Sequence, residues 1–299
     1  MSAIERALSS LSTVILGKNQ QLKLSMCCLL ADGHLLIEDL PGMGKTTLSH
    51  ALAQVFGLKY SRIQFTSDLL PADIIGVSIF EKDPDSGEGA FRFHQGPVFA
   101  QVVLADEINR ATAKSQSALL EAMEERQVTV EGQTRPLPQP FFVIATQNPS
   151  SQGGTFPLPE SQLDRFLMCL SLGYPDERAE RELLEGVSRR HLVEDLQTVI
   201  SPETLVRLRQ AVEGVKASSA VLDYLQRILA FSRNDMRFTH GLSPRAGLAL
   251  LRAAKAWAVI EGRTFLIPED VQAVLEPVVD HRLKSGAARH ILENVAALA

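Results

Sequence analysis

The chain has 299 residues, of which 45% are apolar and 22% charged, and its formal net charge is -5. These values are typical of a soluble globular protein that buries its core in one large domain or two smaller ones. The acidic balance argues against a protein that coats nucleic acid, and the sequence contains no run of 18 apolar residues that would predict a membrane span.

The N-terminus and the cysteines indicate where the protein works. The first ten residues include Glu5 and Arg6 and lack an apolar core, so we expect no signal peptide and no membrane insertion. Cys27 and Cys28 are adjacent in an apolar run, and Cys169 is far from both. Without a C-x-x-C spacing, buried reduced thiols in a cytoplasmic protein are the expected state, rather than a disulfide or a zinc site.

The first third of the chain predicts helices, a strand, a loop and a further helix. Residues 3–15 and 19–31 place apolar residues at helical spacing. Residues 34–39 (HLLIED) then predict a short buried strand that runs into a glycine-containing loop, and residues 45–57 predict a helix that ends at Gly57. Strand, glycine loop and helix in this order are the context in which phosphate-binding loops occur.

The middle of the chain alternates between strands and helices. Because the predicted strands are mostly separated by helical patterns, a parallel sheet covered on both faces is expected. Two inserts combine β-branched residues with turn residues and predict hairpins that project from the sheet. The predicted strands are residues 59–65, 101–107, 140–149 and 166–172, the main helix between them is 113–127, and the hairpins are 76–96 and 126–140.

From residue 176 onward the pattern is wholly helical. Several segments begin with Ser or Pro followed by Glu or Asp, which are helix-start signals. The fold class is therefore α/β, with a parallel-sheet domain in residues 1–175, N-terminal helices included, and an all-helical lid domain in residues 176–299. The predicted helices of the second domain are residues 176–190, 201–215, 218–234, 243–262 and 267–283, followed by a short last one.

Residues 38–48 read EDLPGMGKTTL and nearly match G-x-x-x-x-G-K-[ST], the pattern of phosphate-binding loops. Asp39 stands where the pattern has its first glycine. In such a loop, backbone N–H groups and a helix N-terminus bind phosphates, Lys45 would contact the β- and γ-phosphates, and the Thr46 hydroxyl would ligate Mg²⁺. An ordinary turn that caps a helix is the alternative. The predicted nucleotide contacts are Pro41, Gly42, Met43, Gly44, Lys45, Thr46 and Thr47.

Two later strands end in polar residues. The segment VVLADEINR ends its apolar run at Asp106 and Glu107, and VIATQNP ends at Asn148. Because strand ends in a parallel sheet face the ligand crevice, Asp106 is expected to hold Mg²⁺ and Glu107 to polarise the attacking water as general base. The Asn148 amide could bond the γ-phosphate or that water, although alone it reads more simply as a turn residue. After a phosphate loop, the acidic pair predicts ATP hydrolysis.

Six blocks in this order resemble the MoxR family of AAA+ ATPases: EDLPGMGKT, VVLADEINRA, QSALLEAMEERQVTVEG, FFVIATQNP, GTFPLPESQLDRFLM and LSPRAGLALLRAAKAWA. The resemblance implies that Arg165 in QLDRF is an arginine finger that reaches the neighbouring subunit's nucleotide. It implies that Arg245 in SPRA is a sensor-2 arginine that touches the γ-phosphate in its own subunit. An arginine in a helix's first turn opposes the helix dipole, which favours an anionic partner. Gly17 in VILGKNQ matches a stretch that borders the adenine.

The same resemblance implies an assembly and a biological role. ATP and Mg²⁺ would be used at the subunit interfaces of a ring, expected to be a hexamer, and movement of the lid would remodel a client protein. A von Willebrand A domain protein is the implied partner, nucleic acid is not expected, and the client is not specified. The hairpins would face the pore or the substrate, or be inert. Two alternatives stay open: a magnesium-chelatase-like or DNA-motor AAA+ subunit, and a regulatory switch that binds nucleotide with little hydrolysis.

Overall fold

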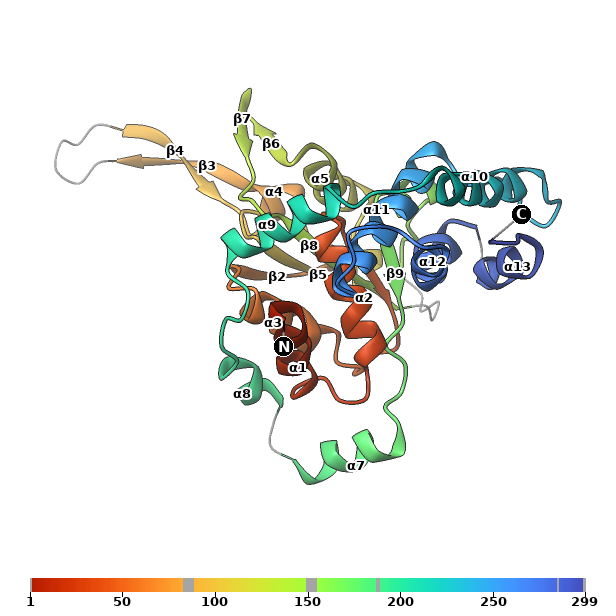
Figure 1. Ribbon diagram of the computed structural model, residues 1–299. Coiled ribbons are helices and arrows are strands. Elements are labelled where there is room, and N and C mark those ends of the chain that lie inside the picture. Colours follow the sequence, from red (N-terminus) through yellow and green to blue (C-terminus); the bar gives the residue numbers. More distant parts are fainter. Residues whose placement is uncertain (1, 83–88, 149–154, 187–188, 284, 298–299) are drawn as a thin grey trace.

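The computed structural model describes residues 2–82, 89–148, 155–186, 189–283 and 285–297. At its centre is a five-stranded parallel sheet with the strand order β2-β5-β8-β1-β9 (Figure 1). The predicted parallel sheet is therefore confirmed. Its strands are β1 (Leu35–Glu38), β2 (Tyr60–Gln64), β5 (Val102–Asp106), β8 (Phe142–Gln147) and β9 (Met168–Leu170).

Both faces of the sheet are buried, which explains why its strands are apolar almost throughout. Along β5, Val102 and Leu104 point into one core, and Val103 and Ala105 point into the other. This period of two is the geometry of a strand, in which successive side chains leave opposite faces. The covering helices are α1 (Ala3–Ser12), α2 (Asn19–Leu30) and α3 (Lys45–Val55) on the first core and α4 (Pro71–Ile75) and α5 (Ala113–Glu125) on the second.

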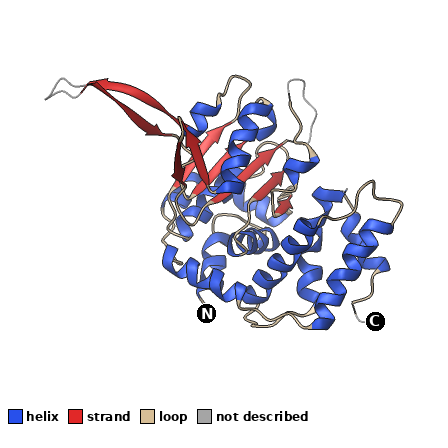
Figure 2. Ribbon diagram, turned by 90° about the horizontal axis from the view of Figure 1, so that it is seen from above, coloured by secondary structure: helices blue, strands red, loops and turns tan. Residues whose placement is uncertain are grey.

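Both predicted hairpins are present as antiparallel pairs, β3 (Gly76–Lys82) with β4 (Gly89–Gln95) and β6 (Gln127–Val130) with β7 (Gln133–Pro136). The β3–β4 pair extends well away from the sheet (Figures 1 and 2), and its turn lies outside the described residues. In the second hairpin, Glu131 and Gly132 have φ angles of 53° and 74°. Two successive left-handed residues are what a tight two-residue hairpin turn requires.

The lid begins its helices as the sequence predicts. The side chains of Ser201, Ser218 and Ser243 each accept a hydrogen bond from a first-turn N–H and so cap three lid helices. The helices are α9 (Pro202–Glu213), α10 (Ser219–Asn234), α11 (Pro244–Ile260), α12 (Pro268–Leu283) and α13 (Ala287–Asn294).

The connection to the lid differs from its prediction. The single helix expected over residues 176–190 is instead two helices, α7 (Glu177–Glu185) and α8 (Arg189–Glu194). Gly186 is extended, with ψ of 174°, and so ends α7. Helix α8 then packs back against α3 of the sheet domain. The chain therefore returns to the first domain before it enters the lid.

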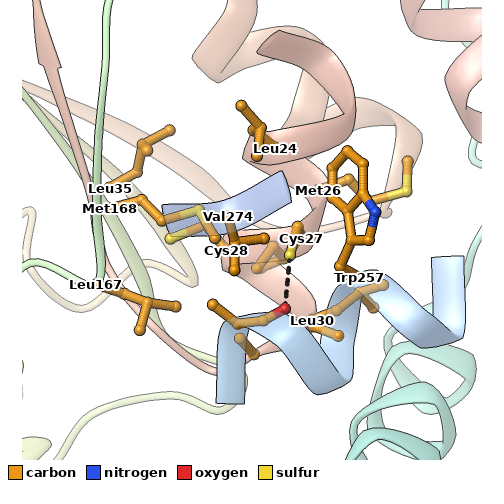
Figure 3. Packing of buried hydrophobic residues seen from close by; sticks show 14 of the residues in the cluster. Leu24, Met26, Cys27, Cys28, Leu30, Leu35, Leu167, Met168, Trp257 and Val274 are labelled. Atoms are coloured by element: carbon orange, nitrogen blue, oxygen red, sulfur yellow. Dashed lines mark hydrogen bonds between the residues drawn. The ribbon is translucent and has the colours of Figure 1, made fainter. Parts of the chain in front are cut away.

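One apolar core joins the sheet domain to the lid (Figure 3). Cys27 and Cys28 of α2 lie in it together with Trp257 of α11, Val274 of α12 and Met168 of β9. The Cys27 thiol donates to the Ala253 carbonyl at 3.2 Å, and burial raises the pKa of Cys27 and Cys28. All three cysteines are free, as expected.

The domain boundary is less sharp than the sequence suggests. Because α2 lies in the core that the sheet domain shares with the lid, a division at residues 175 and 176 stays a prediction. Within the described ranges, none of the helices combines the length and apolar character needed to cross a bilayer.

Candidate functional site

The phosphate-loop sequence forms an open loop between β1 and α3. Gly42 and Gly44 have φ angles of 84° and 87°, which side chains with a Cβ rarely adopt, so glycine is needed at both positions. A Cβ placed on either would meet no atom within 4 Å, so this backbone borders open space. The space is a cavity of about 330 Å³, and its lining residues are Pro41, Gly42, Gly44, Lys45, Thr46, Thr47, Asp106, Glu107 and Asn148.

Lys45 closes the loop on itself. Its Nζ donates to the main-chain carbonyls of Asp39 at 2.6 Å and Leu40 at 3.0 Å. Partial burial lowers the pKa of Lys45, and the carboxylates of Asp39, Asp106 and Glu107 oppose that shift. Lys45 also lines the cavity. An anionic ligand bound there can therefore replace the two carbonyls as partners of the ammonium.

Asp39, the departure from the loop pattern, faces away from this cavity. Its buried carboxylate accepts hydrogen bonds from the backbone N–H groups of Leu172 at 2.5 Å and Gly173 at 2.8 Å through Oδ2. Oδ1 accepts from the N–H of Leu40 at 3.1 Å. The carboxylate thus fastens the start of the loop to the segment that follows β9, and Asp39 is not among the residues that line the cavity.

The acidic pair at the end of β5 is held by residues of both neighbouring strands. Asp106 Oδ1 accepts from the Thr146 hydroxyl at 2.7 Å, and Oδ2 pairs with the Arg62 guanidinium at 2.7 Å. The same Thr146 oxygen accepts from the N–H of Glu107 at 2.9 Å. Thr146 is fully buried, so this one hydroxyl fixes both acidic residues relative to β8.

Glu107 has an unusual backbone and two side-chain partners. Its φ of 56° and ψ of 48° are left-handed, a conformation that costs energy for a residue other than glycine and that often occurs at functional sites. Its Oε2 accepts from the Gln64 amide at 3.1 Å and pairs with Arg110 at 3.2 Å. In this structure the carboxylate is therefore restrained at the edge of the cavity.

The donor set fits a nucleotide with its magnesium ion. Mg²⁺ is usually held by one or two protein oxygens together with the oxygens of bound phosphates. Thr46 and Asp106 line the same cavity and supply such oxygens. In the described ranges there is no group of three or more His, Cys, Asp or Glu residues that could hold a metal without a phosphate ligand.

Two predicted contact residues lie elsewhere. Met43 is half-buried against the apolar core below the loop and does not line the cavity. Gly17, with φ of 67°, packs against the start of α7, where an added Cβ would come within 3.1 Å of Ala179 and 3.2 Å of the Asp176 carboxylate. The Lys18 ammonium next to it donates to the Tyr174 carbonyl at 2.6 Å. Gly17 thus flanks the segment after β9 and does not line the cavity.

Arg165 and Arg245 lie together near the amino ends of the parallel strands, whereas the cavity lies at their carboxyl ends. Arg165 pairs with Glu124 at 3.0 Å and donates to the Leu120 carbonyl at 2.7 Å, and Arg245 pairs with the other oxygen of Glu124. Their pocket, of about 250 Å³, also includes residues 32–34, which precede β1, whereas the phosphate loop follows β1. The structure therefore does not form the expected contact between Arg245 and the phosphate site of its own chain, because the length of β1 lies between them.

This second pocket carries an excess of positive charge. Its lining includes three carboxylates, those of Asp32, Glu124 and Asp164. Against them stand five guanidinium groups, those of Arg126, Arg165, Arg245, Arg252 and Arg282. A concave surface with more cations than anions attracts negatively charged ligands. We call it the arginine pocket.

Several residues of these sites were not identified from the sequence. Thr146 reads as an ordinary residue of a buried strand, and Arg62 and Gln64 read as polar ends of β2. The useful signal is strand order: β2 and β8 both neighbour β5, and Gln64 pairs in register with Asp106. Glu124 carries no signal of its own, because its role depends on two arginines that are remote in sequence.

Comparison with known proteins agrees with this geometry. Residues 34–168 match the ATPase family associated with various cellular activities (AAA), and residues 230–298 match the AAA lid domain. A crystal structure of a protein from Cytophaga hutchinsonii superposes with a TM-score of 0.89 at 35% identity, covering 98% of this chain and 94% of that one.

Curated relatives narrow the family further. Chaperone MoxR1 of Mycobacterium tuberculosis is 41% identical over 94% of this chain and 75% of its own length. Protein MoxR of Paracoccus denitrificans is 33% identical over 92% and 86%. By contrast, a magnesium-chelatase 38 kDa subunit of Acidiphilium rubrum is 30% identical over only 71% and 61%. The chain belongs to the MoxR family of AAA+ ATPases.

Proposed function

We propose that the chain binds ATP with Mg²⁺ in the cavity between the phosphate loop and the carboxyl ends of β5 and β8, and that it hydrolyses the ATP there. The observation that carries this proposal is that one cavity collects Lys45, Thr46, Asp106, Glu107 and Asn148 from three separate segments. Each of these side chains matches one requirement of phosphoryl transfer, namely charge, metal ligation, water activation or contact with the terminal phosphate. A turn that merely caps a helix would not gather them.

Each residue has a defined task in this proposal. Lys45 exchanges its two carbonyl partners for phosphate oxygens, and the Thr46 hydroxyl and the Asp106 carboxylate hold Mg²⁺, which offsets phosphate charge when bound. Glu107 accepts a proton from the attacking water. Thr146 keeps Glu107 and Asp106 in register, and Asn148 donates to the terminal phosphate or orients the water. Gly17 and the backbone at Met43 lie outside the lining of this cavity, and we propose that they border the part of the nucleotide that extends beyond it.

The arginine pocket complements the nucleotide cavity in a second subunit. Arg165 and Arg245 lie at the amino ends of the strands, so the nucleotide they serve must belong to a neighbour that presents its carboxyl edge. Arg245 is thus proposed to act in trans together with Arg165, in place of the same-subunit contact expected from the sequence. Such a head-to-tail contact is heterologous and can close into a ring, for which we propose six subunits.

The central test is Glu107→Gln. ATP affinity should be retained, and turnover should fall by at least about two orders of magnitude, because the general base is lost. Glu293→Gln, at an exposed glutamate of α13, is the matched control and should leave turnover unchanged. Near-normal turnover of Glu107→Gln would contradict the assignment, and a wild-type protein that binds ATP without steady-state hydrolysis would favour the regulatory switch.

The trans role has its own experiment. Arg165→Ala and Glu107→Gln should each be inactive alone, and mixing them should restore activity at interfaces where an intact site meets intact arginines. The absence of restoration in mixed rings would contradict the trans role without affecting the nucleotide site itself.

We propose a chaperone-like role in the cytoplasm, in which hydrolysis moves the lid and remodels a client protein. The support is membership of the MoxR family and the name of the relative Chaperone MoxR1. A von Willebrand A domain protein is the proposed partner. The ATP-bound Glu107→Gln protein should retain partner and client in a pull-down. DNA binding with a steep salt dependence would instead favour a DNA motor.

A further inference from the structure

The turn that carries Arg165 is held by a residue of the lid. This turn, residues 164–167, connects α6 (Glu160–Leu163) to β9. Arg282, near the end of α12, inserts its side chain beside the turn, and only 6% of that side chain is exposed. A guanidinium so deeply buried is costly unless each donor has a partner, so its contacts reveal what it holds.

Most of the N–H groups of Arg282 donate hydrogen bonds to the turn. Nε donates to Asp164 Oδ1 at 2.7 Å, and Nη2 donates to the carbonyls of Asp164 at 3.2 Å and Phe166 at 2.6 Å. Nη1 donates to the Leu167 carbonyl at 3.3 Å and to that of Val278 in its own helix. The acceptors lie immediately before and after Arg165, so the fork fixes the backbone from which Arg165 projects.

The second oxygen of Asp164 reaches the helix that carries Arg245. Oδ2 accepts from the Ser243 hydroxyl at 3.3 Å, and the Ser243 hydroxyl oxygen itself accepts from the N–H of Ala246 at 3.0 Å as the cap of α11. Arg245 lies two residues after that cap. One carboxylate therefore connects α12, the start of α11 and the turn with Arg165, while Glu124 joins the two arginines at their tips.

A second ion pair of the lid makes no such contact with the turn. Arg263 pairs with Asp270, whose side chain is only 1% exposed. Asp270 also accepts from the N–H of Ile267, so that pair remains within the lid. The Arg282 contacts instead cross from the lid to the turn of the sheet domain, where Arg165 lies.

We propose that Asp164 and Arg282 are positioning residues for Arg165 and Arg245. They set the direction in which one subunit presents its two arginines to the nucleotide of its neighbour. This inference rests on the proposed trans role. It also gives a physical route between sites: a lid that moves in one subunit carries Arg282 and Ser243 with it and so displaces the arginines offered to the next subunit's nucleotide.

The test uses subunits with complementary defects. Arg282→Met should lower kcat at least about tenfold, because a small displacement of a catalytic group is costly, while its own nucleotide affinity stays within about threefold. Arg282→Lys should not rescue kcat, because an ammonium cannot span the separated acceptors. Arg263→Met, the matched control, should retain kcat even where it lowers the Tm.

Mixing identifies the cause of the defect. An Arg282→Met subunit retains an intact nucleotide site and a disturbed arginine pocket, whereas Glu107→Gln has the reverse. In rings mixed at random from equal amounts, half of the subunits offer an intact nucleotide site and half offer an intact arginine pocket. Activity should therefore return at about a quarter of the interfaces. A protein that is merely destabilised would not recover in this way. If Arg282→Met does not fold, Asp164→Asn takes its place with the same expectation.

The outcomes separate the two proposals. If Arg165→Ala is restored by Glu107→Gln and Arg282→Met is not, although mixed rings form, the positioning role is overturned and the trans role stands. If neither is restored, the trans role itself fails. Unchanged kcat in both Arg282→Met and Asp164→Asn also overturns the positioning role.

Discussion

Removing the carboxylate of Asp39 should weaken the fold around the phosphate loop and leave ATP affinity nearly unchanged. The carboxylate is buried and accepts from the N–H groups of Leu172 and Gly173. In Asp39→Ala the buried Leu172 donor loses its partner, and the half-buried Gly173 donor is left to water. An unsatisfied buried donor costs about 1–3 kcal/mol, so the pair should cost about 2–4 kcal/mol in all. The corresponding fall in Tm is roughly 4–16 °C.

Asp39→Asn separates charge from structure. The amide oxygen can still accept from Leu172 and Gly173, so the loss of stability should be about 1–2 kcal/mol. The Kd for ATP, measured by titration with a fluorescent analogue, should stay within about tenfold of the wild-type value. Two features support this expectation: the carboxylate points away from the cavity, and its charge opposes the lowering of the Lys45 pKa by burial.

The control for Asp39→Asn is Asp73→Asn, which removes the same charge from an exposed carboxylate that bonds the N–H of Leu70 at the start of α4. A gain in ATP affinity well beyond tenfold in Asp39→Asn, without one in Asp73→Asn, would refute the reasoning. It would show that the Asp39 charge repels nucleotide.

Three other predictions concern the site, pH and the hairpin. Thr146→Val should reduce turnover at least about tenfold, because the hydroxyl that joins Asp106 to the N–H of Glu107 is lost. Thr146→Ser keeps a hydroxyl and should retain most activity. Equal turnover in the two variants would contradict this role of Thr146. Burial lowers the pKa of His34 and of His281 to about 3. The unfolded chain therefore binds protons that the folded chain does not. As the pH falls below about 6.5, each of the two histidines should lower the free energy of unfolding by about 1.4 kcal/mol per pH unit. In urea unfolding at pH 6.5 and 5, His34→Gln should remove the contribution of His34 to this pH dependence. Phe91→Ser, at a 73% exposed position, should change the free energy of unfolding by less than about 1 kcal/mol, and a larger loss would show that the hairpin is part of the core.

The grouping of residues in the cavity beside the phosphate loop was predictable because these residues follow strands that the sequence identifies. Glycine, lysine and threonine are consecutive in the loop, and Asp106 ends a strand whose apolar run is unmistakable. The carboxyl ends of parallel strands meet at one edge whatever their order. Thr146 and Gln64 were missed because their importance depends on which strands neighbour β5, and a single sequence does not give strand order.

The position of Arg245 could not be inferred for a related reason. Its motif identifies a lid helix, but the direction from which a lid approaches the sheet is set by tertiary packing. Here α11 and α12 share a core with α2 and β9, so the start of α11 lies near the amino ends of the strands. A contact with the phosphate loop of the same chain would require this core to open.

The placement of the two pockets has a consequence for assembly. A four-residue strand such as β1 spans about 10 Å, and the phosphate loop and the arginine pocket lie beyond its two ends. No side-chain rotation brings Arg165 or Arg245 across that distance to the loop of the same chain. If these arginines serve hydrolysis, the complete site must contain two chains in head-to-tail contact, and each chain then offers one unused half to a further neighbour. Closure into a ring leaves no half unused, which is the physical reason for expecting activity to rise with assembly.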